Sequence, residues 1–235
     1  MPKPVIVFDL DGTLIDTAPD LLDSLNHCLT QSGHEAAQHD DLRQLVGHGA
    51  RVMITRALTT QGKPAREEEI SGLFDLFLEH YASNMPGRSR PYPGALDAVE
   101  RFLSAGYRAA ICTNKYQSLS ETLMGSLGLE TQFAAICGAD RFEFRKPDPR
   151  HLTGTIRLAG GAIDGSIMIG DSRTDIDTAK AAGIPVVAVD WGYTDHHVSK
   201  FEPDTIISHF DELTPTITRR LHGRRTAHAE SVAPD

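Results

Sequence analysis

Short apolar runs rich in β-branched residues recur along the chain, separated by stretches with helical spacing. The runs are VIVF (5–8), RAAICT (108–113), FAAIC (133–137), SIMIG (166–170) and VVAV (186–189). Between them, apolar residues three or four positions apart predict helices, as at Leu96, Val99 and Leu103. Strands that alternate with helices indicate a parallel sheet with helices on both faces. The strands are apolar throughout rather than at alternate positions, which fits burial of both faces.

One long stretch, from Asp16 to about Arg90, breaks this alternation and contains no convincing strand. Its apolar residues follow helical spacing from Leu21 to Leu29 and again from Ile70 to Met85. The predicted fold is therefore α/β: a Rossmann-like parallel sheet plus an all-helical cap inserted after the first strand. We expect a catalytic core of residues 1–15 and 91–222, a cap of residues 16–90, and a loose polar tail of residues 223–235.

Polar clusters follow the predicted strands. In a parallel α/β sheet, ligands bind beyond the carboxyl ends of the strands, where the strand order reverses. Four clusters are expected to meet at this edge: Asp9 to Thr13, Thr113 to Lys115, Lys146 to Pro149, and Gly170 to Ser172 with Asp175. Ser172 and Asp175 also fit a helix capping box, as do Thr17 and Asp20, and capping is compatible with a role in the site.

The chemistry of these side chains suggests phosphoryl transfer. Several carboxylates close together repel one another unless a cation lies among them, and oxygen ligands at an open site suit Mg²⁺. Lys146, Thr113 and Asn114 can donate hydrogen bonds to phosphoryl oxygens. Gly12 permits close approach of the backbone, and the N–H groups after it, beginning at Thr13, add candidate anion contacts. A carboxylate nucleophile that forms an aspartyl-phosphate is one known route.

The composition of the chain limits the kinds of molecule that it is expected to bind. The 235 residues are 40% hydrophobic and carry a formal net charge of −9, so we expect neither nucleic-acid nor membrane binding, both of which need a basic face. Three cysteines without a C-x-x-C pair argue against a disulfide framework or structural zinc and favour the reducing cytoplasm. The N-terminus MPKPVIVFDL has no signal-peptide pattern. The expected partner is a small phosphate ester, and the oligomeric state is left open.

Four motifs give the chain a family resemblance. They are DLDGTLID (9–16), TN (113–114), KPDP (146–149) and GDSRTD (170–175). In this order they resemble the haloacid dehalogenase-type phosphatases over nearly the whole chain, and the helical insert matches the smaller cap that the family carries after its first motif.

The resemblance implies a role for each catalytic residue. Asp9 would be the nucleophile. Asp11 would be the general acid that protonates the leaving alkoxide and then activates water. Thr113 and Lys146 would hold the transferring phosphoryl group, with Asn114 beside them.

The same resemblance implies Mg²⁺ as cofactor. Its ligands would be Asp9, the backbone carbonyl of Asp11, and Asp171, while Asp175 would support the site without ligating the ion.

Other segments suggest the substrate. LVGHGARVMITRAL (45–58), DTAPDL (16–21), TNK (113–115) and PDTIISHFDEL (203–213) are similar to bacterial phosphoglycolate phosphatases. This implies hydrolysis of 2-phosphoglycolate, with substrate contacts in the cap from Gly47, His48, Gly49 and Arg51. The alternatives are a phosphatase of another small sugar or acid phosphate, or a phosphosugar mutase. Intact Asp9, Asp11 and Lys146 speak against a non-catalytic binding module.

Overall fold

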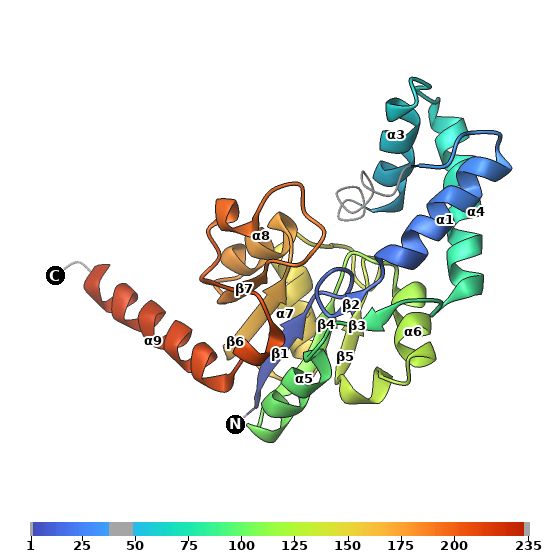
Figure 1. Cartoon of the computed structure of the whole chain (residues 1–235). Helices are drawn as coiled ribbons and strands as arrows, with labels where there is room; N and C mark the ends of the chain where they lie inside the picture. The colour runs from blue at the N-terminus through green and yellow to red at the C-terminus, as the bar shows by residue number, and fades with distance from the viewer. Residues whose placement is uncertain (1, 38–48, 233–235) are drawn as a thin grey trace.

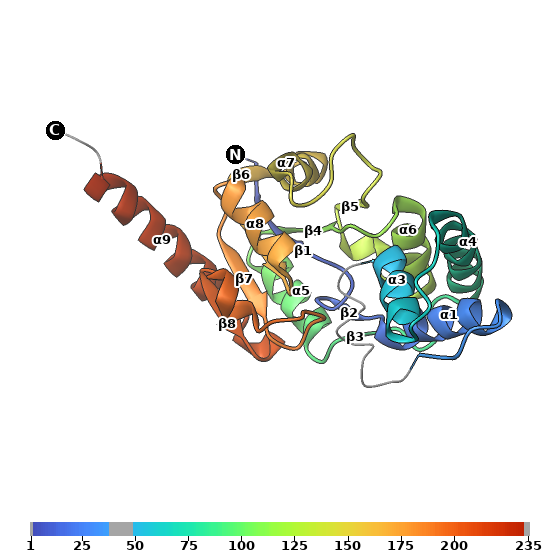
Figure 2. The same ribbon diagram turned by 90° about the horizontal axis from the view of Figure 1, so that it is seen from above.

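A six-stranded parallel sheet organises the chain (Figures 1 and 2). The computed structural model describes residues 2–37 and 49–232, with side chains up to residue 223. The strand order is β5-β4-β1-β6-β7-β8, and every pairing is parallel, which confirms the α/β prediction. The strands are β1 (Pro4–Phe8), β4 (Arg108–Cys112), β5 (Ala135–Cys137), β6 (Ala162–Gly170), β7 (Val186–Val189) and β8 (Thr205–Ile207).

Helices cover both faces of the sheet. In β1, Val5 and Val7 pack on one face with side chains of α7 (Pro149–Leu158) and α8 (Arg173–Ala181). Ile6 and Phe8 point to the other face. There they join apolar side chains of α5 (Ala95–Ser104), α6 (Gln117–Ser126) and α9 (Pro215–Val232). Short 3₁₀ helices complete the connections: η1 (Glu130–Gln132), η2 (Val198–Phe201) and η3 (Phe210–Glu212).

Three further helices follow β1 and stand beside the sheet domain: α1 (Ala18–Gln31), α3 (Ala50–Thr60) and α4 (Glu67–Asn84) (Figure 1). We call them the cap helices. Their apolar stripes bury one another in a separate hydrophobic cluster that includes Leu25, Ile54 and Phe77. The cap boundaries at residues 16 and 90 stay a prediction, although the hydrophobic clusters of the molecule support them.

The two connections to the cap helices pair with each other. β2 (Ile15–Asp16) and β3 (Arg90–Pro91) form an antiparallel ribbon of two residues each. The sequence analysis expected no strand in this stretch, because two residues are too few to show a period of two. We call these two connections the hinges, and the ribbon places them side by side.

The two predicted helix caps have different outcomes. Ser172 and Asp175 form a reciprocal capping box at the start of α8, as predicted. The prediction for Thr17 is wrong, because its side chain makes no capping hydrogen bond at the start of α1. The Thr17 hydroxyl instead donates to Oδ1 of Asp11 at 2.7 Å.

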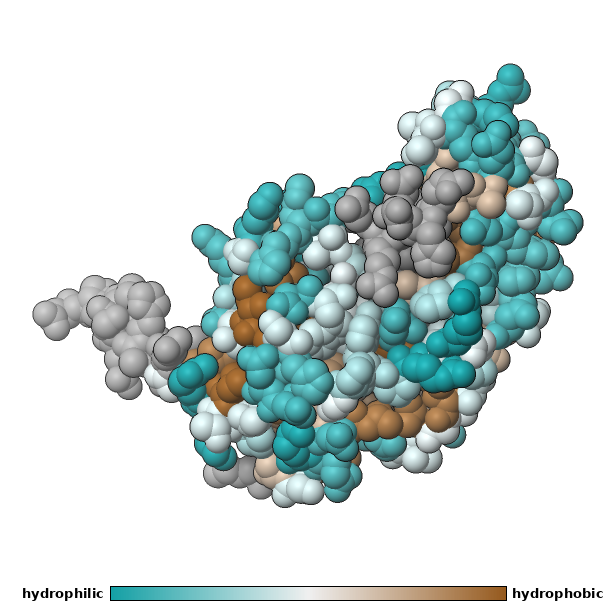
Figure 3. All heavy atoms as spheres, in the orientation of Figure 1, coloured by the Kyte–Doolittle hydropathy of each residue, from teal (hydrophilic) through white to brown (hydrophobic). Residues whose placement is uncertain are grey.

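The end of the chain is more regular than its composition suggested. α9 continues to Val232 and extends away from the sheet, whereas the sequence predicted a loose tail from residue 223 (Figure 1). None of the helices among the described residues combines the length and the apolar character needed to cross a membrane. Hydrophilic residues cover most of the face seen in Figure 3, as expected for helices that bury one side.

Candidate active site

The strand order reverses beside β1, because the chain adds β4 and β5 on one side of it and β6, β7 and β8 on the other. Asp9 directly follows β1, Thr113 follows β4, and Asp171 follows β6. The parallel pairing of β1 with β6 continues past the end of β1, because the Asp9 N–H donates to the carbonyl of Ile169 at 2.9 Å. Three neighbouring strands therefore deliver polar side chains to one edge, at the position where ligands bind in such sheets.

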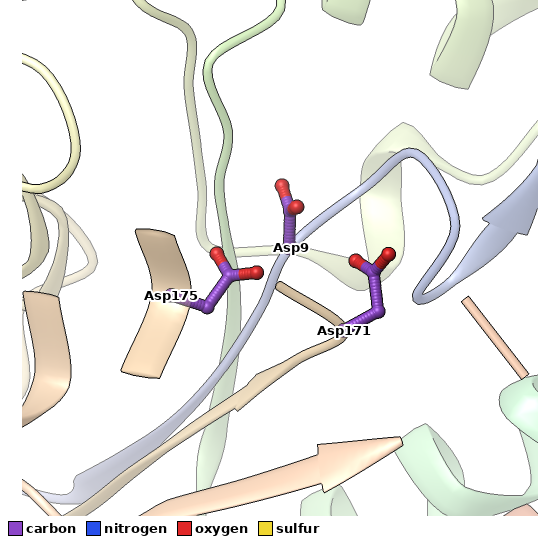
Figure 4. Close-up of side chains that lie close together, drawn as sticks. All are labelled: Asp9, Asp171 and Asp175. Carbon is purple, nitrogen blue, oxygen red and sulfur yellow. The ribbon is translucent and has the colours of Figure 1, made fainter. Parts of the chain in front are cut away.

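Asp9, Asp171 and Asp175 converge at this edge (Figure 4). Each offers a carboxylate oxygen, and these oxygens lie within 4.8 Å of one another. The three residues are 9%, 2% and 0% exposed. Asp175 comes from α8, where its other carboxylate oxygen accepts from the N–H and hydroxyl of Ser172. This cluster is a set of buried, hard oxygen donors that could hold a metal ion.

Lys146 supplies the opposing charge. Its ammonium is 2.9 Å from Oδ1 of Asp9 and 2.6 Å from Oδ1 of Asp175. The loop that carries Lys146 is fixed from two sides: its carbonyl accepts from the Asn114 amide at 2.9 Å, and its N–H donates to Nδ1 of His151 at 3.1 Å. The Asn114 amide thus holds the Lys146 loop, and its contact with a phosphoryl group stays a prediction.

Burial and charge shift the pKa values of this cluster. Burial raises the pKa of Asp9 to about 6, although Lys146 works in the opposite direction. Burial, with the negative charges of Asp175 and Asp9, raises the pKa of Asp171 to about 8. Burial disfavours the Lys146 ammonium, yet Asp175 and Asp9 outweigh it and raise its pKa. A divalent cation would offset the repulsion that raises the pKa values of these carboxyls.

Asp171 is held in a fixed orientation. The Thr13 hydroxyl donates to its Oδ1 at 2.8 Å, and the backbone N–H of Tyr193 donates to its Oδ2 at 2.8 Å. Gly12 has a φ of +79°, and a Cβ there would lie 2.8 Å from Oδ2 of Asp171. Close approach to this carboxylate therefore requires glycine at position 12. The structure places the Thr13 side chain on Asp171, a contact that the sequence analysis did not foresee.

Asp11 points away from the acidic cluster. Its carboxylate oxygens lie 3.0 and 3.2 Å from the ammonium of Lys115, and one also accepts from Thr17. The ammonium lies 4.4 Å from the centroid of the Tyr81 ring. Burial disfavours the Lys115 ammonium, but Asp11 outweighs it and raises the pKa of Lys115. Asp11 therefore stands at the side of the site nearest the cap helices.

A cavity of about 170 Å³ lies between the strand ends and the cap helices. The polar part of its lining includes Asp9, Asp11, Thr113, Lys115 and Asp171. Its apolar part comes mainly from the cap helices and is formed by Leu21, Met53, Phe74, Phe77, Leu78 and Tyr81. A substrate whose reacting group lies at Asp9 would thus contact charged residues on the side of the strand ends and apolar side chains on the side of the cap helices.

The predicted cap contacts are placed only in part. Gly47 and His48 lie outside the described residues, and Gly49 lines the cavity. The Arg51 guanidinium turns to Glu67 and lies over the ring of Phe74 at 4.9 Å from its centroid. Arg51 does not line the cavity in this structure, since Glu67 is its ionic partner, and its substrate contact stays a prediction.

Sequence reasoning missed one residue of the site and misjudged another. Tyr193 was not considered, although a Gly-Tyr pair shortly after a predicted strand belongs to the same sheet edge. The sequence predicts Lys115 only as part of the polar cluster from Thr113 to Lys115, whereas the structure pairs it with Asp11 across 104 positions of sequence.

Comparison with known proteins gives the family. The family model for haloacid dehalogenase-like hydrolases matches residues 6–189. The chain belongs to the haloacid dehalogenase-like hydrolases. This hydrolase is 62% identical over 221 residues to a phosphoglycolate phosphatase of Mesorhizobium japonicum, covering 94% of this chain and 97% of the relative. It is 46% identical over 227 residues to a phosphoglycolate phosphatase of Agrobacterium fabrum, covering 97% of each chain.

Solved structures agree on the fold of this hydrolase. A protein from Haemophilus somnus, described as a predicted phosphoglycolate phosphatase, superposes with a TM-score of 0.82 at 28% identity. The match covers 90% of this chain and 96% of the other.

Proposed function

We propose that this hydrolase is a Mg²⁺-dependent phosphomonoesterase that hydrolyses 2-phosphoglycolate to glycolate and phosphate. The observation that carries the proposal is the position of Asp9, whose carboxylate lies 2.9 Å from the Lys146 ammonium, belongs to the cluster with Asp171 and Asp175, and lines the cavity. The choice of substrate is supported by the names of the relatives from Mesorhizobium japonicum and Agrobacterium fabrum.

The residues of the cluster fit Mg²⁺, because they present buried carboxylate oxygens close to one another, and burial with like charges nearby raises the pKa of Asp9 and of Asp171. Asp9 and Asp171 would hold the ion with the backbone carbonyl of Asp11, and Asp175, which already bonds Lys146 and Ser172, would support them. When bound, Mg²⁺ neutralises charge on the phosphoryl oxygens.

In the proposed mechanism, a carboxylate oxygen of Asp9 attacks phosphorus, and the bond from phosphorus to the leaving oxygen breaks. Asp11 gives a proton to the leaving alkoxide. In the second half-reaction it takes a proton from water, which attacks the aspartyl-phosphate and releases phosphate. Asp11 lines the same cavity as Asp9 and lies beside Lys115, which supports this role.

The remaining side chains orient the phosphoryl group and the substrate. Lys146 stabilises charge on the phosphoryl oxygens, and the Thr113 hydroxyl and Asn114 amide lie at the same edge. Lys115 lines the cavity and offers a positive charge to the glycolate carboxylate. The apolar side chains of the cap helices exclude water from the reacting atoms when they cover the substrate.

A cytoplasmic location belongs to the same proposal. The three cysteines, Cys28, Cys112 and Cys137, are free and buried, which fits a reducing compartment.

A kinetic screen of small phosphate esters in Mg²⁺ tests this function. We expect kcat/KM for 2-phosphoglycolate to exceed that for sugar phosphates by about tenfold or more. Excess EDTA should abolish turnover, and glycolate and phosphate should form in equal amounts. Formation of glucose 6-phosphate from glucose 1-phosphate would identify a mutase and contradict the proposal, as would undiminished activity in EDTA.

A further inference from the structure

The segment Trp191–Asp195, which follows β7, contacts the acidic cluster and the cap helices at once. The backbone N–H of Tyr193 donates to Asp171 at 2.8 Å. The Tyr193 hydroxyl donates to Oδ1 of Asp16 and accepts from the N–H of Ala18 at 2.9 Å. Asp16 ends β2 and Ala18 begins α1. One residue, 3% exposed, therefore contacts a carboxylate of the cluster through its backbone and the start of the cap helices through its side chain.

The packing around this link leaves little room for independent movement. A Cβ on Gly192 would lie 2.1 Å from Cβ of Asp171. A Cβ on Gly12 would lie 2.8 Å from Cδ2 of the Tyr193 ring. Contacts this short do not occur between real side chains, so both backbones approach as closely as glycine permits. A shift of Tyr193 must therefore be shared by Asp171 or by Gly12.

The same segment reaches a second cap helix through an ion pair. The Arg56 guanidinium of α3 lies 3.3 and 3.4 Å from the carboxylate oxygens of Asp195. Both side chains are more than a third exposed, so the pair is weak and can break and re-form when the cap helices move. The cap helices thus contact the segment Trp191–Asp195 at Tyr193 and at Asp195.

We propose that Tyr193 is a positioning residue that couples the cap helices to divalent-cation binding at Asp171. The proposal rests on the proposed function for the identity of the cation. When the cap helices hold the Tyr193 hydroxyl through Asp16 and Ala18, they also fix the position of the Tyr193 backbone N–H, which orients Asp171. Because such coupling is reciprocal, Mg²⁺ binding favours this cap position, and loosening the hinge weakens Mg²⁺ binding.

The test is the substitution Tyr193→Phe, which keeps the ring and the backbone N–H and removes only the hydroxyl. We expect the Kd for Mg²⁺, measured by calorimetry without substrate, to rise by about fivefold or more. The Mg²⁺ concentration that half-saturates p-nitrophenyl phosphate hydrolysis should rise by the same factor. The matched control is Tyr107→Phe, whose hydroxyl contacts Thr218 at 2.9 Å before β4, at the opposite edge of the sheet. It should leave both values unchanged.

Arg56→Ala is the second variant, since it alters an exposed side chain. It should raise the Kd for Mg²⁺ in the same direction, and its effect should be less than additive with that of Tyr193→Phe. A folded Tyr193→Phe protein with an unchanged Kd would overturn the proposal. If that variant does not fold, an unchanged Kd in Arg56→Ala overturns it instead. Since Mg²⁺ is titrated without substrate, failure to hydrolyse 2-phosphoglycolate refutes the proposed function and leaves this test intact.

Discussion

At the scale of single residues, the aspartates of the site lie in different environments, and these fit the different roles expected for them. Asp9 and Asp171 are buried among like charges, which raises their pKa values and favours a cation between them. Asp11, only two residues after Asp9, faces Lys115 and Thr17 at the edge of the cavity. The intervening Leu10 is fully buried, and the chain has left β1 and turns here, so the two aspartates meet different surroundings of one site.

Asp9→Asn is expected to lower kcat by about a thousandfold or more, because an amide cannot act as the nucleophile. The fold should persist, since Lys146 keeps Asp175 as its ionic partner. Steady-state kinetics with 2-phosphoglycolate and a melting curve measure the two effects. Asp97→Asn, an exposed position on α5, is the control and should behave like the unaltered chain. Comparable turnover in the two variants would refute the nucleophile assignment.

At the scale of elements, α1 is tied to the second hinge by one buried carboxylate. Asp20, in the first turn of α1, accepts hydrogen bonds from the N–H of Arg88 and from the N–H and hydroxyl of Ser89. Together with the β2–β3 ribbon, this contact fixes both connections to the cap helices next to each other. The angle at which α1 leaves the sheet domain is thus set by polar contacts rather than by helix propensity.

Asp20→Ala should destabilise the protein by about 3 kcal/mol, because it leaves buried N–H and hydroxyl donors without an acceptor. Asp23→Ala provides a matched control on the same helix. Asp23 contacts Arg88 through an ion pair in which both side chains are more than half exposed, so its loss should change stability by about 0.5 kcal/mol or less. Chemical denaturation of both variants gives the comparison, and similar free energies of unfolding would contradict it.

At the scale of the whole molecule, two hydrophobic layers on the sheet and a third cluster among the cap helices enclose one charged site. The number of protons bound at that site changes the free energy of unfolding of the whole protein. Without metal, folded Asp171 keeps its proton up to a pKa of about 8, whereas the ordinary pKa of an aspartate carboxyl is 3.8. The folded state binds more protons than the unfolded state within this window, so the stability of the metal-free protein falls as pH rises through it.

Mg²⁺ should therefore stabilise the protein more strongly at about pH 8 than at about pH 6, because at the lower pH it must displace protons from the cluster. Melting temperatures with excess Mg²⁺ and with EDTA at each pH measure the gain. Asp171→Asn should remove most of the difference between the two pH values. An equal gain in melting temperature at both pH values would show that these protons are not linked to metal binding.

The sequence by itself determined the alternation of strands and helices, the helical insert and the four motifs, three of which follow strands. These features are local. A buried strand or helix face requires apolar residues at regular spacing along the sequence, and turns require particular residue types. The family was accessible for the same reason, since each motif is contained in a few consecutive residues. The short strands β2, β3 and β8 carried too little pattern to be found.

Only the tertiary structure decided which side chains contact one another. The hydroxyl of Thr17 bonds Asp11 rather than capping its helix, and Lys115 meets Asp11 across 104 positions of sequence. Tyr193 reaches Asp16 across 177 positions. Such contacts depend on the order of the strands and on where the cap helices stand over them, and neither leaves a local pattern in the chain. The residue types of the site are thus encoded in local motifs, and the contacts between them are set by how the elements pack.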